Sequence, residues 1–346
     1  MDFADLTYIM KQLIQLCSIS SPAGNTQKIM DYLSRELDEL GISYNSTHKG
    51  ALIATISGKE RSIHRHIVAH VDTLGAMVKE IKPNGRLKLT KIGGYNWNSL
   101  EGALCYLETG AGNRYSGTIL NTHASVHVYE DHAKQERNDD TMEVRIDEKV
   151  KNQDDVAALG IAVGDFVSFD PRLRVTDSGF INSRHLDDKA SAAVLLGVLK
   201  YLRENNLPLP YTTNIMFSNN EEIGYGGNAG ITPETKEYLV VDMGAVGEGQ
   251  ATDEFCVSIC AKDSSGPYHF GLRQKLVQLA QEHKIYYKVD VYPHYGSDAS
   301  SALRAGFDIV HGLIGPGIDA SHGHERTHKE ALANTAGLLL HYLLAQ

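Results

Sequence analysis

Apolar positions recur with the period of a helix near both ends of the chain, and shorter apolar runs between them predict strands. The helical pattern covers residues 6–17, 26–40, 190–202, 271–283, 298–304 and 329–344. The expected strands are residues 51–56, 63–71, 213–218, 238–242, 285–292 and 309–314. Residues 63–71 are mostly apolar, which is typical of a parallel strand buried on both faces. This alternation predicts an α/β fold with a mixed sheet flanked by helices.

Helical periodicity disappears between about Gly75 and Asp177. Short alternating strands are expected there at residues 86–91, 118–121, 142–146 and 166–169, and glycines separate them. The α/β pattern resumes afterwards. We therefore expect a small all-β, barrel-like domain at residues 75–176, inserted into a larger domain formed by residues 1–74 and 177–346.

Composition narrows the classes of function. The 346 residues are 42% apolar, which is enough for two domains with buried cores. Lysine and arginine number 33 against 43 acidic residues, so the net charge of −10 argues against nucleic acid or an anionic membrane as partner. We find no apolar run long enough for a membrane helix and no secretory signal, since Asp2 and Asp5 replace a basic start. Four cysteines make no disulfide framework, and a cytoplasmic location is expected.

Two adjacent carboxylates, Glu221 and Glu222, follow the expected strand 213–218 without a basic neighbour. Such a pair is costly to bury unless a cation neutralises it. Other acids and a histidine also stand at strand ends or at a helix start: His70, Asp72, Asp187 and Asp242. His322 lies in a further segment, Ser321–Glu325, that could supply a ligand. Chemistry in open α/β sheets collects at the carboxyl ends of the strands. The segments therefore predict a dinuclear metallohydrolase.

Each of these residues also has an ordinary structural interpretation. His70 could be a hydrogen-bonded core histidine, and Asp187 with Asp188 could cap a helix. The two glutamates could belong to a solvated loop. His324 competes with His322 for the same role. Three further histidines, in the predicted insertion, are expected to take no part in the site: His123, His127 and His132.

The order of these motifs, ending in the stretch His322–His328, resembles the TET-type aminopeptidases. This family is also known as the deblocking or glutamyl aminopeptidases and, by an older name, as cellulase M. It belongs to the co-catalytic zinc exopeptidases, and the resemblance covers essentially the whole chain. It implies that Asp187 bridges two metal ions. The remaining ligands would be His70 and Asp242 for one ion, and Glu222 and His322 for the other.

The resemblance also implies the chemistry. A metal-activated water would hydrolyse the first peptide bond of short peptides, with Glu221 as general base and Asp72 orienting His70. Zinc is the expected metal, with cobalt or manganese as alternatives. The peptide bond between Asp187 and Asp188 would be cis. Relatives form homo-oligomers from dimers to dodecamers, so the insertion is expected to serve in dimerisation or assembly.

Two positions depart from the family pattern. Thr73 stands where many relatives have an acid, and Ser297 stands where relatives often have threonine in a loop expected to line the specificity pocket. Other functions remain open at this point: a glycosidase such as an endoglucanase, a noncatalytic protein that keeps the metals for assembly or binding, or a carboxypeptidase or deacylase. The chain has a single tryptophan, Trp97, whereas sugar-binding clefts are rich in aromatic residues.

Overall fold

The computed structural model describes residues 5–346, so the expectation that involved Asp2 lies outside the described residues. The chain forms two compact units. One unit runs up to Asp72 and continues from Arg172 to Gln346, and the other comprises Thr73–Pro171. Each unit has its own hydrophobic core.

The first unit is built on a 13-stranded mixed sheet. Four neighbouring strands at its centre are parallel: β12 (Tyr211–Ser218), β3 (Glu60–His70), β13 (Thr235–Val241) and β18 (Val310–Asp319). One flank adds β2 (Leu52–Ile56) and β1 (Tyr44–Ser46), and the other adds β19 (Glu325–His328), β11 (Phe180–Ser183) and β10 (Arg174–Val175). Shorter branches are β14 (Gly244–Val246), β15 (Val257–Asp263), β16 (Gly266–Pro267) and β17 (Tyr287–Val291). Parallel pairing brings the carboxyl ends of the central strands to one edge.

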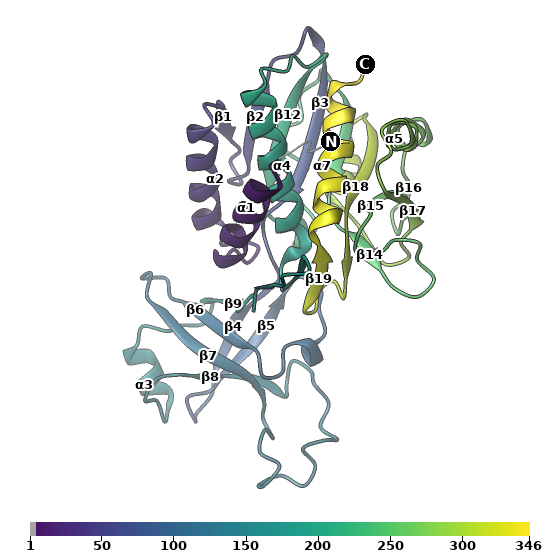
Figure 1. The fold of residues 1–346 in the computed structure, drawn as a ribbon. Helices are drawn as coiled ribbons and strands as arrows, with labels where there is room; N and C mark the ends of the chain where they lie inside the picture. Colours follow the sequence, from purple (N-terminus) through teal and green to yellow (C-terminus); the bar gives the residue numbers. More distant parts are fainter. Residues whose placement is uncertain (1–4) are drawn as a thin grey trace. The chain divides into compact units, whose positions relative to one another are not determined.

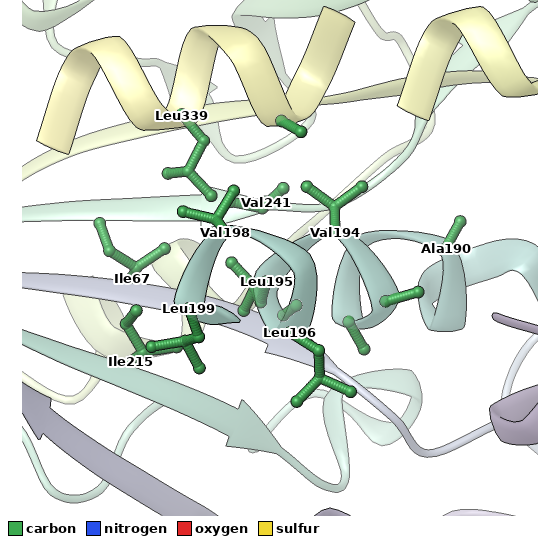
Figure 2. Close-up of a cluster of buried hydrophobic side chains, with 14 of the residues drawn as sticks. Ile67, Ala190, Val194, Leu195, Leu196, Val198, Leu199, Ile215, Val241 and Leu339 are labelled. Atoms are coloured by element: carbon green, nitrogen blue, oxygen red, sulfur yellow. The ribbon is translucent and has the colours of Figure 1, made fainter. Parts of the chain in front are cut away.

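Helices pack against both faces of this sheet. They are α1 (Leu6–Ser18), α2 (Gln27–Glu39), α4 (Leu186–Glu204), α5 (Phe270–Glu282), α6 (Asp298–Arg304) and α7 (Lys329–Leu344). Figure 1 shows α1, α2, α4 and α7 together on one of these faces. Side chains alternate between the faces of a strand, so Ile67 of β3 packs in the cluster of α4, whereas Val68 packs in the cluster of α6. Figure 2 shows Val198 of α4 beside Val241 at the end of β13 and Leu339 of α7, in the same core cluster. This core anchors α4, whose first turn carries acids of the predicted metal site.

The second unit contains a closed barrel in the order β4 (Gly75–Ile81), β5 (Leu87–Ile92), β8 (Met142–Ile146), β7 (Arg114–Asn121), β6 (Leu104–Glu108) and β9 (Phe166–Phe169). It also holds a short helix, α3 (Gln153–Ala158), and a 3-10 turn, η1 (Trp97–Ser99). Trp97 is only 2% exposed and belongs to the barrel core. The single tryptophan is therefore a packing residue of this unit.

The predicted fold class, an α/β domain with a mixed sheet plus a small β-barrel, is confirmed. The helices expected at residues 298–304 and 329–344 have those bounds as α6 and α7. Within residues 5–346, no helix is long and apolar enough to cross a membrane. Strand β15 was not predicted, although it pairs with β16, β17 and β18.

Candidate metal centre

His70 ends β3 and is almost completely buried, with 2% of its surface exposed. Its Nδ1 lies 3.0 Å from the backbone oxygen of Asp72 and 3.5 Å from the Asp72 carboxylate. A carbonyl oxygen can only accept, so Nδ1 carries a proton, and Nε2 is the ring nitrogen that remains to bind a metal ion. Nε2 lies 3.1 Å from Oδ1 of Asp187.

The two glutamates lie on a 3-10 turn, η2 (Glu221–Ile223), that follows β12. The flanking residues Asn220 and Gly224 both have φ of 87°, so the chain turns sharply on each side. The Asp72 carboxylate accepts hydrogen bonds from the backbone N–H groups of Glu221 and Glu222, at 3.0 and 3.2 Å. Asp72 therefore fixes the turn that carries both glutamates, in addition to contacting His70.

The chain after this turn needs glycine. A Cβ at Gly227 would lie 2.2 Å from the hydroxyl of Tyr238 and 2.5 Å from Cβ of Asp298. Asp298 accepts a 2.6 Å hydrogen bond from the Gly227 N–H and another from the Ser218 hydroxyl. The buried carboxylate of Asp298 thus links the end of β12 to the glycine-rich segment.

Asp187 and Asp188 open α4 with non-helical backbone angles, and the peptide bond between them is cis, as the family resemblance implies. The two oxygens of Asp187 face different imidazoles. Oδ1 lies 3.1 Å from His70 Nε2, and Oδ2 lies 3.3 Å from His322 Nε2. This placement between two histidines suits a carboxylate shared by two metal ions.

Asp242 follows β13 directly, and its Oδ1 accepts a 2.6 Å hydrogen bond from the N–H of Met243. His322 lies on the loop between β18 and β19, and its Nε2 is 3.5 Å from Oε2 of Glu222. His324, the rival position, places its Nε2 3.4 Å from the backbone oxygen of Arg172. Two groups of three side chains have ligand atoms within 4.8 Å of one another: His70, Asp188 and Asp242, and His70, Asp187 and Glu222.

Burial gives the site its electrostatic character. It raises the pKa of Glu222 to about 8 and the pKa of Asp242 to about 7, and it raises the pKa of Glu221 well above the usual range. Burial alone would lower the pKa of His70, but hydrogen bonds with Asp187 and Asp72 raise it. Bound cations stabilise the ionised form of carboxylates that are buried in this way. Imidazole and carboxylate together are a donor set that fits zinc and related divalent ions.

A cavity of about 380 Å³ opens beside these residues. Its lining includes the predicted acids and His322, together with residues of the segment that leads into and forms α6: His294, Tyr295, Gly296, Ser297, Asp298, Ser301 and Arg304. The site is therefore a polar cavity lined by acids, histidines and hydroxyl groups.

Sequence reasoning assigned no role in the site to three buried acids near the predicted ligands: Asp188, which lies close to His70 and Asp242, and Glu325 and Asp298. Glu325 is 2% exposed and accepts hydrogen bonds from the N–H groups of Asp187 and His322, at 3.2 and 3.0 Å. Asp298 holds the glycine-rich segment. Glu325 stands three residues after His322, and that spacing was the available signal; nothing local distinguished Asp298 from a helix-capping acid.

Comparison with known proteins identifies the family. A sequence model described as M42 glutamyl aminopeptidase matches residues 50–338. The chain is 59% identical over 334 residues to YhfE of Bacillus subtilis (strain 168), itself a candidate aminopeptidase, and the match covers 96% of each protein. It is 24% identical over 330 residues to the glutamyl aminopeptidase of Lactococcus lactis, covering 90% of this chain and 88% of that protein.

Solved structures agree on the fold. The TET1 peptidase of Pyrococcus horikoshii superposes with a TM-score of 0.87 at 21% identity, covering 98% of this chain and 100% of that one. The TET aminopeptidase of a Thaumarchaeota archaeon gives a TM-score of 0.88 at 17% identity, covering 97% and 96%. The predicted family is confirmed, and an aminopeptidase is favoured over the alternatives left open by the sequence. The chain belongs to the M42 glutamyl aminopeptidase family.

Proposed function

We propose that this enzyme is a dizinc aminopeptidase that removes the first residue from short peptides. The observation that carries the proposal is the position of Asp187, whose two carboxylate oxygens face His70 and His322 separately. His70 and Asp242 would hold one ion with Asp187, and Glu222 and His322 would hold the other. When bound, such ions lower the pKa of a water molecule and polarise the carbonyl that is attacked.

Glu221 is our candidate for the group that moves the proton. Its Oε2 lies 3.9 Å from His70 Nε2, and its side chain lines the cavity beside Glu222. Burial raises its pKa well above the usual range, which brings it nearer to the pH at which a carboxyl can both accept and release a proton. We propose that Glu221 takes a proton from water and delivers it to the departing amine, while Asp72 holds its turn in place.

Two substitutions separate proton transfer from metal binding. Glu221→Gln should retain both ions and lose turnover of aminoacyl-arylamides by a factor of roughly a hundred or more. Asp187→Ala should lose metal, as measured by elemental analysis, and Glu248→Gln, at an exposed position, serves as control. Normal turnover by Glu221→Gln would refute its assigned role. Blocking the amino terminus of the same peptides should abolish hydrolysis by the unmodified enzyme.

We further propose that the protein is a cytoplasmic homo-oligomer, from dimer to dodecamer, and that the inserted domain, residues 75–176, contributes to assembly. The Pyrococcus horikoshii TET1 peptidase can assemble into a tetrahedron or a large octahedral shell. In this chain, Val126 and Val128 of the second unit are 67% and 70% exposed, which supports a contact surface there. Val126→Asp combined with Val128→Asp should lower the mass measured by light scattering. A monomeric unmodified protein would refute assembly.

A further inference from the structure

Ser297 occupies the N-cap position of α6, yet its side chain makes no capping hydrogen bond. Serine at an N-cap normally accepts a hydrogen bond from the first turn of the helix. Here the Ser297 oxygen lies 2.8 Å from the hydroxyl of Tyr268 instead, while Ser297 also lines the cavity beside the predicted metal ligands. Ser297 therefore does not cap the helix with its side chain.

Behind Ser297, a buried chain of polar groups leads away from the cavity. The Tyr268 hydroxyl donates a 2.8 Å hydrogen bond to Oδ2 of Asp263, and both residues are at most 4% exposed. Ser265 donates its backbone N–H to Oδ1 of Asp263 at 2.7 Å, and the Ser300 hydroxyl donates to Oδ2 at 3.4 Å. Donors thus converge on both oxygens of Asp263, which acts as the acceptor at the end of the chain.

This arrangement decides which atom of Ser297 can face a ligand. Tyr268 has one hydroxyl proton, and that proton points to Asp263. Burial raises the pKa of Tyr268 well above its usual value, so the phenol keeps this proton. The Tyr268 oxygen must then accept the proton of Ser297. The lone pairs of the Ser297 oxygen remain for the cavity side.

We propose that Ser297 is a substrate-binding residue that accepts a hydrogen bond from an N–H group of the bound peptide, with Tyr268 and Asp263 as positioning residues that set its polarity. The inference rests on the proposed peptidase function, because it assigns a ligand group in the same cavity. A peptide offers three sources of such a donor: its terminal ammonium group, the N–H of the scissile bond and a donor on the first side chain.

Three variants test the chain. Ser297→Ala removes the acceptor, and kcat/KM for aminoacyl-arylamides should fall roughly tenfold, whereas Ser297→Thr should keep most of the activity. Asp263→Asn should reverse the direction of the hydrogen bonds that join residue 263, Tyr268 and Ser297. The amide oxygen of the new side chain remains opposite the Ser265 N–H, so its NH2 group faces Tyr268, which must then donate to Ser297 and turn the serine proton into the cavity. The expected rise in KM at similar kcat should match that of Ser297→Ala.

Ser300→Ala is the matched control, because Ser300 also bonds to Asp263 but is not among the cavity-lining residues. Metal content and thermal unfolding should stay close to those of the unmodified enzyme in all four variants. Three substrate pairs locate the donor: a terminal amine against its quaternary trimethylammonium form, which has no N–H group, an arylamide against the aryl ester, and glutamine against methionine as first residue. The Ser297→Ala penalty should vanish for the substrate that lacks the donor.

Unchanged kinetics of Ser297→Ala and Asp263→Asn, with active unmodified enzyme, would overturn this inference alone. A rise in KM for Ser297→Ala without one for Asp263→Asn would overturn the positioning role. Inactivity of the metal-loaded unmodified enzyme on every aminoacyl substrate would instead refute the proposed function and this inference with it.

Discussion

Asp72 shows how one side chain beside the predicted ligands can organise the candidate metal site. Its backbone oxygen contacts Nδ1 of His70, and its carboxylate holds two consecutive N–H groups of the turn that carries Glu221 and Glu222. The sequence predicted only the partnership with His70, since two residues on the same face of a strand are easily recognised. The bond to a turn 149 residues further along the chain depends on the folded sheet.

Asp72→Asn tests whether the Asp72 carboxylate is needed to hold the turn that carries Glu221 and Glu222. Asparagine has one acceptor oxygen, so its NH2 group would oppose one of the two N–H groups and displace the turn. We expect metal affinity to fall roughly ten- to a hundredfold, as measured by titration calorimetry. Asp308→Asn, at an exposed position, is the control. Equal affinity in Asp72→Asn and in the unmodified enzyme would contradict this role.

His66 makes the stability of the protein depend on pH, because its side chain is buried. It is fully buried, and its ring stacks on Tyr238 with centroids 5.1 Å apart. Burial lowers the pKa of His66 to about 3, against 6.5 for a free histidine. The unfolded chain therefore binds a proton that the folded chain excludes, and the protein loses stability as pH falls from about 6.5 towards 3.

His66→Phe keeps an aromatic ring for the stack and removes the titration. As pH falls below 6.5, the free energy of unfolding measured in urea should rise for the variant relative to the unmodified protein, by up to roughly 1.4 kcal/mol per pH unit. Acids near the predicted metal site titrate in both proteins and cancel in this difference. A stability difference that stays constant between pH 7 and pH 5 would be incompatible with a neutral, buried His66.

At the scale of the elements, strands β13 and β18 approach closely where Asp242 leaves the sheet. A Cβ at Gly315 would lie 1.6 Å from the backbone oxygen of Asp242. Gly315→Ala must therefore push the two strands apart, at a cost of about 2 kcal/mol or more in the free energy of unfolding. It should also weaken metal binding through Asp242. Gly247→Ala is the matched control, because a Cβ there meets nothing within 4 Å; equal urea midpoints for the two variants would contradict the expectation.

Helices and strands with a clear pattern of apolar residues could be predicted from the sequence. Strands that form only because they pair with neighbouring strands could not. Helices α6 and α7 follow from their apolar spacing, and β3 follows from its apolar run. Strand β19 reads Glu-Arg-Thr-His and has no apolar residue, so its pattern resembles a loop, and pairing with β11 and β18 makes it a strand. The candidate site was predictable for a related reason, since parallel strands end at the same edge.

The unpredicted parts of the site depend on contacts between distant turns. Asp298 is bound to Gly227, and Glu325 to Asp187. A carboxylate at a helix start or in a loop has many possible partners, and sequence spacing does not select among them. The same limit applies to Ser297, whose position suggests a cap that the structure does not make.

At the scale of the whole molecule, one unit is continuous in sequence and the other is interrupted. The barrel of Thr73–Pro171 begins directly after Asp72, so the segment that carries His70 and Asp72 leads straight into the second unit. The ligands predicted for the metal ions nevertheless all belong to the first unit. The fold of that unit is therefore sufficient to bring them together, and bound metal should stabilise it directly.

Metal removal should lower the thermal stability of the protein most at alkaline pH. Burial raises the pKa of Glu222 to about 8 and the pKa of Asp242 to about 7, above the ordinary values of 4.5 and 3.8. In the metal-free protein, protonation of these groups favours the folded state below about pH 4, and that contribution is lost as pH rises through 7 and 8. Bound cations require the ionised forms, so their contribution grows over the same range. The melting temperatures of metal-loaded and chelator-treated enzyme should therefore differ more at pH 8.5 than at pH 6, and an equal or smaller difference at pH 8.5 would show that these carboxylates do not bind the metal.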